Sequence, residues 1–406
     1  MKLDVKTLNA IGNLGRTFVL HSLRRAIRGR GKGDGKRTFM ENYRADAFVA
    51  LTPGERAALH GYEKCIACGV CASVCPVYSP ARDGAYRAPD SITAALTRSF
   101  PDFTYARDAV YNCTRCRACE TACPRGIKVP ELVAMARRIA WRQDERGVRG
   151  MYAGVVGNLE RTGNPFGEGT VQIGEFRREK AEYVFIAGCV ARHRLRDKTL
   201  KTLEFLDGMG VNFTTVEETC CGNAYLALGM EDAAADAARA LIRTVRRTGT
   251  DRVITLCPHC FHSFRTFRPY AEALKVSHTL QILRAAPGGA GAARAETVTY
   301  HDACFISRWA GLYDEPRKAL ADAGVSVAEM KRNRESAFCC GSPLGAFIED
   351  AAVIESMRRE RLAEAVDTGA EKLIAECPAC VLAFSGIAGD GMKVQLLTEY
   401  LREKTP

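Results

Sequence analysis

The sequence predicts an α+β multidomain protein in which a helical, cysteine-rich domain is followed by two copies of a small α/β domain. Two observations lead to this prediction. All 18 cysteines of the 406 residues fall into four dense sets, and the last two sets repeat one pattern within similar flanking segments. The length suggests two to four domains, and 47% hydrophobic residues are ample for their cores.

The first two cysteine sets share the spacing C-x-x-C-x-x-C-x-x-x-C-P. They are Cys65, Cys68, Cys71 and Cys75, and then Cys113, Cys116, Cys119 and Cys123. Three thiolates on one tight turn can reach three irons of a cubane, and in two-cluster ferredoxins the fourth cysteine serves the neighbouring cluster. We therefore predict one cubane on Cys65, Cys68, Cys71 and Cys123, and a second on Cys113, Cys116, Cys119 and Cys75. Zinc is the alternative, but it needs neither the third cysteine nor the trailing Cys-Pro.

The remaining ten cysteines form two sets of five, each in the order C, CCG, C-x-x-C. The earlier set is Cys189, Cys220, Cys221, Cys257 and Cys260, and the later set is Cys304, Cys339, Cys340, Cys377 and Cys380. The glycines after the cysteine pairs, Gly222 and Gly341, would let the backbone turn sharply and approach a metal cluster closely. We expect each set of five to form one metal site.

Short apolar segments run into these cysteine turns and predict buried strands at residues 183–187, 253–256, 298–300 and 372–375. Between them, Ala-rich segments with helical periodicity predict helices at 230–247 and 350–367. Ligands of an open α/β sheet gather at the carboxyl ends of its strands. The five cysteines of each set are therefore expected to meet there.

Composition suggests the domain limits. We expect an arm at 1–40, a helical domain at 41–150 with Pro130 in the first turn of a helix, a Gly-rich linker at 151–180, and α/β domains at 181–288 and 295–406. No apolar run reaches the ~18 residues that span a bilayer. The amino terminus also lacks a secretory pattern, so we expect a protein that stays inside the cell, where cysteine-rich chains usually bind metals.

The net charge of +11 is concentrated in the basic arm, where Ile11, Leu14, Phe18, Val19, Leu23 and Ile27 recur at helical steps. One apolar stripe beside a basic face fits an anionic membrane surface or a groove on a membrane partner. A solvated arm is the alternative. Nucleic acid is not an expected partner, because no stacking platform or binding motif accompanies the charge.

On these motifs, residues 41–406 resemble the family of heterodisulfide reductase D-type subunits. In this family a two-cluster ferredoxin module of the C type is fused to a B-type module with two CCG domains. The resemblance implies a helical two-cluster ferredoxin domain followed by two repeated α/β CCG domains. It implies two [4Fe-4S] cubane clusters and one or two noncubane [4Fe-4S] clusters, a pair of which cleaves a disulfide in the best understood relatives. Both sets of five are complete here, which favours that chemistry.

The resemblance also implies an iron–sulfur oxidoreductase subunit, cytoplasmic and peripheral on the inner face of the cytoplasmic membrane. Expected partners are a membrane cytochrome b or quinone-reactive subunit, further iron–sulfur, cytochrome c or flavoprotein subunits, and a cytoplasmic disulfide or thiol substrate. The alternative is a noncatalytic electron-transfer subunit of a flavin-linked dehydrogenase or quinone-linked respiratory complex. No G-x-G-x-x-G follows a strand, so any flavin would sit on a partner.

We expect the disulfide chemistry to be carried by the two cysteine pairs, Cys220, Cys221, Cys339 and Cys340. The leaving thiolates need proton donors, a role that histidine suits near neutral pH. His259 lies inside the first C-x-x-C turn and is the expected donor. His193, His262 and His301 also lie near ligand cysteines, and a local backbone contact is the alternative for each histidine.

Three arginines, Arg115, Arg117 and Arg125, interleave with the second cubane motif. Positive charge near a cluster would stabilise its reduced state. Arginines that flank a ligand loop usually reach solvent, so exposure or docking of an acidic partner is the favoured expectation.

Overall fold

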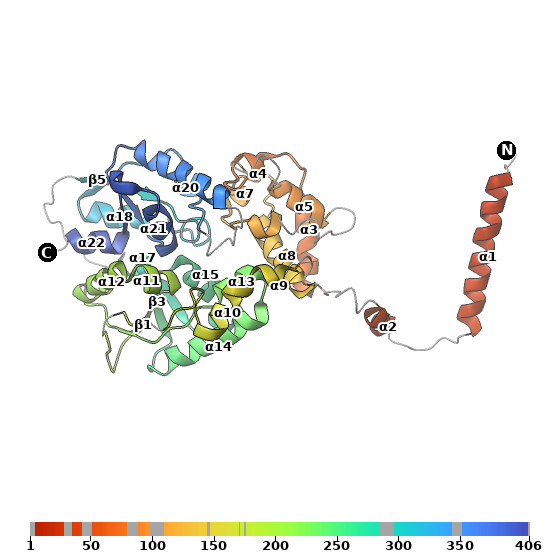
Figure 1. The fold of residues 1–406 in the computed structure, drawn as a ribbon, viewed down its shortest axis with the longest axis horizontal. Coiled ribbons are helices and arrows are strands. Elements are labelled where there is room, and N and C mark those ends of the chain that lie inside the picture. Colours follow the sequence, from red (N-terminus) through yellow and green to blue (C-terminus); the bar gives the residue numbers. More distant parts are fainter. Residues whose placement is uncertain are drawn as a thin grey trace. The chain divides into compact units, whose positions relative to one another are not determined.

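The computed structural model describes residues 5–27, 35–42, 51–78, 88–97, 109–143, 147–169, 171–173, 176–283, 296–342 and 351–404. The chain divides into two compact units, Met1–Ala50 and Leu51–Pro406. The first unit contains helices α1 (Val5–Ile27) and α2 (Gly35–Asn42) (Figure 1). Among the described helices, none combines the length and the apolar character that crossing a membrane requires.

Helix α1 exposes several apolar side chains. Leu14 and Phe18 are 75% and 72% exposed, and Val19 and Leu23 are each 53% exposed. Each pair is four residues apart, but the step from Phe18 to Val19 rotates by about 100° around the helix axis. The expected single stripe is therefore wrong in its geometry, because the apolar side chains form two stripes. The side chains of Ile11 and Ile27 lie outside the described residues.

The second unit begins with a helical domain. Its helices are α3 (Pro53–Tyr62), α4 (Val70–Ser73), α5 (Pro89–Thr97), α7 (Ala118–Thr121) and α8 (Val129–Gln143). Helix α3 begins with a capping box, in which Thr52 Oγ1 accepts from the Glu55 amide and the Glu55 carboxylate accepts from the Thr52 amide over 2.7 Å. Pro130 lies in the first turn of α8, as predicted. The buried side of α8 includes Leu132, Val133 and Ile139.

Two four-stranded parallel sheets follow. The first contains β1 (Tyr183–Ile186), β2 (Phe213–Thr215), β3 (Arg252–Thr255) and β4 (Lys275–His278), in the order β2-β1-β3-β4. The second contains β5 (Glu296–His301), β6 (Val325–Val327), β7 (Lys372–Ala375) and β8 (Lys393–Leu396), in the order β6-β5-β7-β8. The identical strand orders confirm the α+β fold class with two repeated α/β domains.

The helices of the first α/β domain are α11 (Cys189–Arg194), α12 (Arg196–Gly208), α13 (Asn223–Leu228), α14 (Glu231–Arg246), α15 (Pro258–Thr266), α16 (Arg268–Ala271) and α17 (Thr279–Leu283). The second domain has α18 (Glu315–Asp322), α20 (Ala351–Val366), α21 (Pro378–Ser385) and α22 (Leu397–Lys404), with short 3-10 turns at Arg334–Ser336 and Gly389–Gly391. The helices predicted at 230–247 and 350–367 are α14 and α20.

The segment expected as a linker, 151–180, carries helix α10 (Ala153–Thr162), which follows α9 (Val148–Met151). Leu159 of α10 is buried in a cluster that includes Cys220 and Tyr225. The carbonyl of Gly163 accepts from the Cys220 amide over 2.7 Å. The Gly-rich segment expected as a linker therefore contains a helix, which ends at Gly163 in a left-handed conformation (φ 69°).

The two α/β domains pack on each other through α12 and α22. Lys198 Nζ lies 2.9 Å from a carboxylate oxygen of Glu399, and the hydroxyls of Thr202 and Thr398 are 2.7 Å apart. One hydrophobic core includes side chains from both domains, among them Phe185, Leu203, Leu373, Phe384 and Leu396. Within the second unit, the two α/β domains therefore share a buried interface.

Candidate metal centres

Both C-x-x-C-x-x-C-x-x-x-C-P motifs fold through the same turn. In the first motif Ala67 and Gly69 are left-handed, with φ of 52° and 76°, and in the second Arg115 and Arg117 take the same places, with φ of 54° and 66°. Such φ values are uncommon for residues other than glycine. Helices α4 and α7 then begin at the same point of each motif. The sequence repeat is therefore a repeat of backbone geometry.

The cysteines of the two motifs interleave. Cys65, Cys68, Cys71 and Cys123 line one cavity of about 20 Å³, which Cys119 also borders. Burial, followed by the charges of neighbours that include Cys116 and Cys113, raises the pKa of Cys75 to about 12. Cys75 therefore lies among the thiols of the second motif. These neighbourhoods support the proposed exchange of the fourth cysteine between the two cubanes.

The thiols of the five cysteines in the first α/β domain are close neighbours. The neighbouring thiols are Cys189 and Cys220, Cys220 and Cys221, Cys221 and Cys260, and Cys260 and Cys257. Cys189 follows strand β1 at the start of α11, and Cys257 follows β3 as the N-cap of α15. Strands β1 and β3 are neighbours at the centre of the sheet, and the chain continues from β1 to β2 on one side and from β3 to β4 on the other. Open α/β sheets bind ligands at such a point, beyond the carboxyl ends of the strands.

Glycines make the close approach of these cysteines possible. A Cβ atom on Gly188 would lie 2.7 Å from Cys257 Cβ and 3.2 Å from Cys260 Sγ. Gly222 and Gly341, which follow the cysteine pairs, have φ of 84° and 64°, so both glycines make the expected turn. The five thiols lie close together, and Gly188 leaves the space that a larger residue would take from Cys257 and Cys260. This arrangement fits a compact metal cluster.

The second α/β domain repeats the arrangement. Its neighbouring thiols are Cys304 and Cys339, Cys339 and Cys340, Cys340 and Cys380, and Cys380 and Cys377. A cavity of about 20 Å³ is lined by these five cysteines together with Thr114 and His259. All 18 cysteines of the chain carry free thiols. The two sets of five are thus equivalent in order, in position on the sheet and in connectivity.

His259 lies between the two sets. Its imidazole hydrogen-bonds to Cys257 of the first set and to Cys377 of the second. Burial opposes the protonated ring, but the hydrogen bonds to these two thiolates raise the pKa of His259 to about 10. The ring also packs on Phe305, with centroids 4.4 Å apart. One imidazole therefore contacts ligands of both candidate CCG sites.

Two of the other histidines near ligand cysteines have partners elsewhere. His193 Nδ1 lies 3.2 Å from a carboxylate oxygen of Glu168. His262 packs on Phe305 and Trp309, and burial lowers its pKa to about 3. For these two histidines the structure favours a local, structural role over proton donation.

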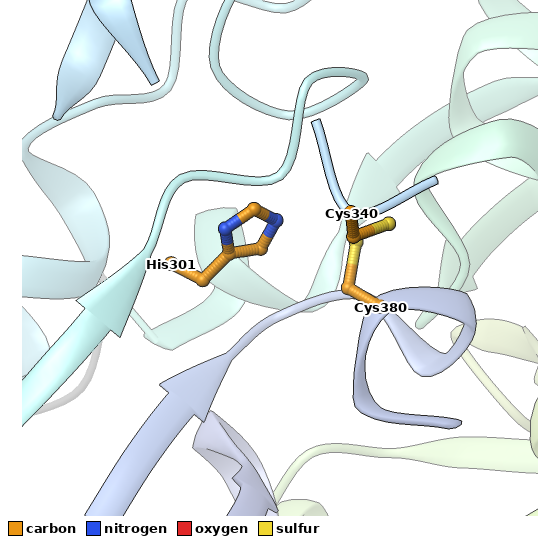
Figure 2. A group of neighbouring side chains, drawn as sticks. All are labelled: His301, Cys340 and Cys380. Atoms are coloured by element: carbon orange, nitrogen blue, oxygen red, sulfur yellow. The ribbon is translucent and has the colours of Figure 1, made fainter. Parts of the chain in front are cut away.

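His301 is different, because it faces the second set. It ends strand β5, is 1% exposed, and offers a ring nitrogen within 4.8 Å of the sulfurs of Cys340 and Cys380 (Figure 2). Its Nδ1 accepts a hydrogen bond from Arg361 Nε over 3.1 Å. Arg361 is itself fully buried and also pairs with Glu364.

The second cubane motif meets the second CCG domain directly. The thiol of Cys116 lies against the thiol of Cys339. Arg308 donates from Nε to the Cys116 carbonyl over 2.6 Å and from Nη1 to the Ala337 carbonyl over 2.6 Å. Trp309 Nε1 donates to the Arg115 carbonyl over 2.9 Å. Nothing in the sequence singles out Arg308 and Trp309, apart from their place shortly after Cys304.

Two arginines of the second cubane motif lie against Trp309 of the second CCG domain. The guanidinium carbons of Arg115 and Arg117 lie 5.7 Å and 4.6 Å from the Trp309 ring centroid. Arg117 also donates to the Arg308 carbonyl over 2.9 Å. The expectation of solvent exposure is therefore wrong for Arg115 and Arg117, because both are half-buried against the indole of Trp309 and Arg117 also binds the Arg308 carbonyl. Arg125 is exposed, as expected.

A buried arginine joins the same motif to the first CCG domain. Arg137, fully buried in α8, donates to the Cys113 carbonyl over 2.6 Å and to the Ala227 carbonyl over 2.9 Å. A Cβ atom on Gly229 would lie 2.4 Å from the Arg137 carbonyl oxygen, so only glycine permits this approach. The second cubane loop is thus anchored to both CCG domains.

Models of known protein families match all three domains of the second unit. Residues 61–127 match the 4Fe-4S dicluster domain, and residues 183–265 and 298–385 each match the cysteine-rich CCG domain. These matches support two [4Fe-4S] cubane clusters in the helical domain and noncubane [4Fe-4S] clusters in the CCG domains. The residues named above supply the thiols for both kinds of cluster.

Several relatives match most of this chain. The chain is 27% identical over 366 residues to the D subunit of the dihydromethanophenazine:CoB–CoM heterodisulfide reductase of Methanosarcina acetivorans, covering 78% of this chain and 87% of that protein. It is 28% identical over 319 residues to the EtfAB:quinone oxidoreductase of Syntrophomonas wolfei, covering 70% of this chain and 44% of that protein. A probable membrane-anchored ferredoxin of Chromohalobacter salexigens is 25% identical, with 81% of this chain and 57% of that protein covered.

The chain thus spans less than half the length of the EtfAB:quinone oxidoreductase and most of the heterodisulfide reductase protein. A crystal structure of a hypothetical protein from Helicobacter pylori shares the fold, with a TM-score of 0.53 at 10% identity over 91% of this chain and 76% of that chain. The dicluster domain, the paired CCG domains and the relatives named above lead to one assignment: the chain is an iron–sulfur oxidoreductase subunit that joins a 4Fe-4S dicluster domain to two CCG domains, and it is similar to heterodisulfide reductase D subunits over most of its length.

Proposed function

We propose that this protein passes electrons through its two cubanes to noncubane clusters on the CCG cysteines, where a disulfide of a cytoplasmic carrier is reduced or its thiols are oxidised. The observation that carries the proposal is the contact between Cys116 of the second cubane motif and Cys339 of the second CCG set. Clusters supply one-electron steps when bound. A direct thiol contact supports electron entry at the second CCG set.

His259 supports cooperation between the two CCG sets. Breaking a disulfide takes two electrons, and each of the two released sulfurs needs a partner. His259 reaches Cys257 of one set and Cys377 of the other. This arrangement supports His259 as a proton donor shared by the two sets, with Cys220, Cys221, Cys339 and Cys340 beside the reacting sulfurs.

The arm supports association with a membrane complex. Leu14 and Phe18 are the most exposed large apolar side chains among the described residues, and Arg16 lies between them in the sequence. Basic helices of this kind bind anionic lipid surfaces. We therefore place the protein on the inner face of the cytoplasmic membrane, with a cytochrome b or quinone-reactive subunit as its partner.

A noncatalytic electron carrier is the second candidate. The cavity at the second CCG set measures about 20 Å³, and eight of the ten CCG cysteines are buried, all but Cys189 and Cys304. A substrate disulfide would need a wider opening than this. The relation to an EtfAB:quinone oxidoreductase also fits a carrier that serves a flavoprotein.

Purification of the native complex separates the two candidates. A cytochrome b partner supports the membrane reductase, and a flavoprotein partner supports the carrier. Within the complex, Cys339→Ala should abolish turnover of disulfide substrates while the cubanes remain reducible. Ser336→Ala is the matched control, since its exposed hydroxyl donates only to the nearby Asn333 carbonyl. Full disulfide turnover in Cys339→Ala would make the carrier the better account.

A further inference from the structure

The two CCG sites differ at one buried position. Ile186 ends β1 three residues before Cys189, and His301 ends β5 three residues before Cys304. Their strand partners agree, because Ile186 pairs with Thr255 and His301 with Ala375, each two residues before a C-x-x-C cysteine. Both side chains are 1% exposed. One site therefore meets an aliphatic group where the other meets an imidazole.

The orientation of the imidazole is set by Arg361. A guanidinium can only donate hydrogen bonds. His301 Nδ1 receives the bond from Arg361 Nε and must therefore present its lone pair. The neutral ring then carries its hydrogen on Nε2. Arg361 is held in place by two further bonds, from Nη1 to the Arg332 carbonyl over 2.6 Å and to the Glu364 carboxylate. Figure 2 shows the far edge of the ring directed at Cys340 and Cys380.

We propose that His301 donates its Nε2 hydrogen to a ligand sulfur of the second CCG site and thereby raises the reduction potential of that site above that of the first. The inference rests on the proposed function, which makes Cys340 and Cys380 cluster ligands. Hydrogen bonds to cluster sulfurs stabilise the more negative, reduced state and help to set the potential. Ile186 can supply no such bond to the first site.

The asymmetry fits the path of the electrons. Cys339, the contact with the cubane motif, belongs to the same set as Cys340 and Cys380. A higher potential at this set would hold an arriving electron next to its point of entry until a second arrives. His301 is thus a positioning and tuning residue, and the chemistry stays with the cysteines.

The test uses the full chain, prepared anaerobically, in the variants His301→Leu and His301→Gln. Leucine imitates the aliphatic group of the first site, and the glutamine amide keeps an N–H donor. Potentiometric titration followed by electron paramagnetic resonance should show a lower midpoint potential for one CCG signal in His301→Leu, recovery of most of the shift in His301→Gln, and unchanged cubane signals. A weak nitrogen coupling to the same signal should change when histidine is labelled with 15N, and His301→Leu should remove it.

Three outcomes would overturn the inference. With full iron, an unchanged CCG potential in His301→Leu would leave His301 a packing residue. A strong nitrogen coupling, with loss of about four irons in His301→Leu, would make His301 a direct ligand instead of a hydrogen-bond donor. If the parent protein holds only about eight irons, the proposed function itself fails, since only the cubanes are then present.

Discussion

Arg308 donates a hydrogen bond from Nε to the carbonyl oxygen of Cys116 over 2.6 Å, across 192 residues of sequence. The same guanidinium binds the carbonyls of Glu335 and Ala337, which shortly precede Cys339. Arg308 is 7% exposed. One buried cation therefore fixes the backbone of a cubane ligand relative to the backbone of a CCG ligand, and with it the distance that an electron must cross.

Replacing this cation should loosen the junction. Arg308→Ala removes three charge-assisted hydrogen bonds from a buried site, so we expect the free energy of unfolding to fall by about 3 kcal/mol. Electron transfer from the cubanes to the CCG clusters should slow, while the cubane signals persist. Denaturant titration measures the first effect, and stopped-flow reduction the second.

Arg268→Ala is the control for this prediction. The Arg268 side chain is 84% exposed and pairs only with Glu272, one helical turn away. Its replacement should leave the denaturation midpoint and the transfer rate unchanged. Equal behaviour of the two variants would mean that Arg308 does not hold the junction.

The absence of a Cβ at Gly188 should matter for metal content. Gly188→Ala would place a methyl group 2.7 Å from Cys257 Cβ, so the first CCG site should lose its cluster. Iron should fall from roughly sixteen to roughly twelve per chain, by the cluster contents assigned above. Gly210→Ala is the matched control, since Gly210 has a similar φ, 76° against 85°, but a Cβ added there would meet no atom within 4 Å. Equal iron in both variants would contradict the close-packed site.

The strands that the sequence predicts are the central ones of each sheet. Residues 183–187 and 253–256 correspond to β1 and β3, and the matching segments of the repeat to β5 and β7. Central strands are covered on both faces and read as continuous apolar runs. The edge strands were not predicted, because segments such as Phe213–Thr215 and Lys275–His278 are short, partly exposed and rich in polar residues.

The candidate ligands could be predicted from cysteine spacing, since a cluster demands several thiolates on one short turn. The residues that connect the sites could not. These residues are Arg308, Trp309 and Arg361, and each contacts backbone or side-chain atoms far away in the sequence. No local sequence pattern marks such a contact. For the same reason the sequence favours surface positions for Arg115 and Arg117, whereas the side chain that binds them, Trp309, lies more than 190 residues away.

Removing the metal should expose a pH dependence that the loaded protein lacks. Burial raises the pKa of Cys75 from 9.0 to about 12. In the metal-free protein the stability from this thiol is complete below about pH 9 and is lost as the pH rises toward 12, because unfolding lets the thiol ionise. The loss expected from Cys75 alone is on the order of 1 kcal/mol per pH unit above pH 9. Denaturation of chelator-treated, reduced protein between pH 7 and pH 10 measures it.

Cys75→Ser is the control for the pH dependence, since a hydroxyl does not ionise in this range. The metal-free Cys75→Ser protein should lose less stability between pH 9 and pH 10 than the metal-free parent. In the loaded parent the sulfur is already a metal-bound thiolate, and its pH profile should be flat in this window. Identical slopes for metal-free parent and variant would show that Cys75 is not the responsible group.

The exposed side chains of α1 should drive binding to anionic vesicles. Leu14→Glu with Phe18→Glu should weaken binding about a hundredfold, because two apolar side chains that enter the lipid contribute about 1.5 kcal/mol each. Deletion of residues 1–37 should abolish binding and leave the cubane signals intact. Asn13→Glu with Thr17→Glu adds the same charge to the same helix without removing an apolar group, so vesicle sedimentation should show a much smaller loss. If both double variants lose binding equally, charge alone explains the attraction and the apolar side chains of α1 do not enter the membrane.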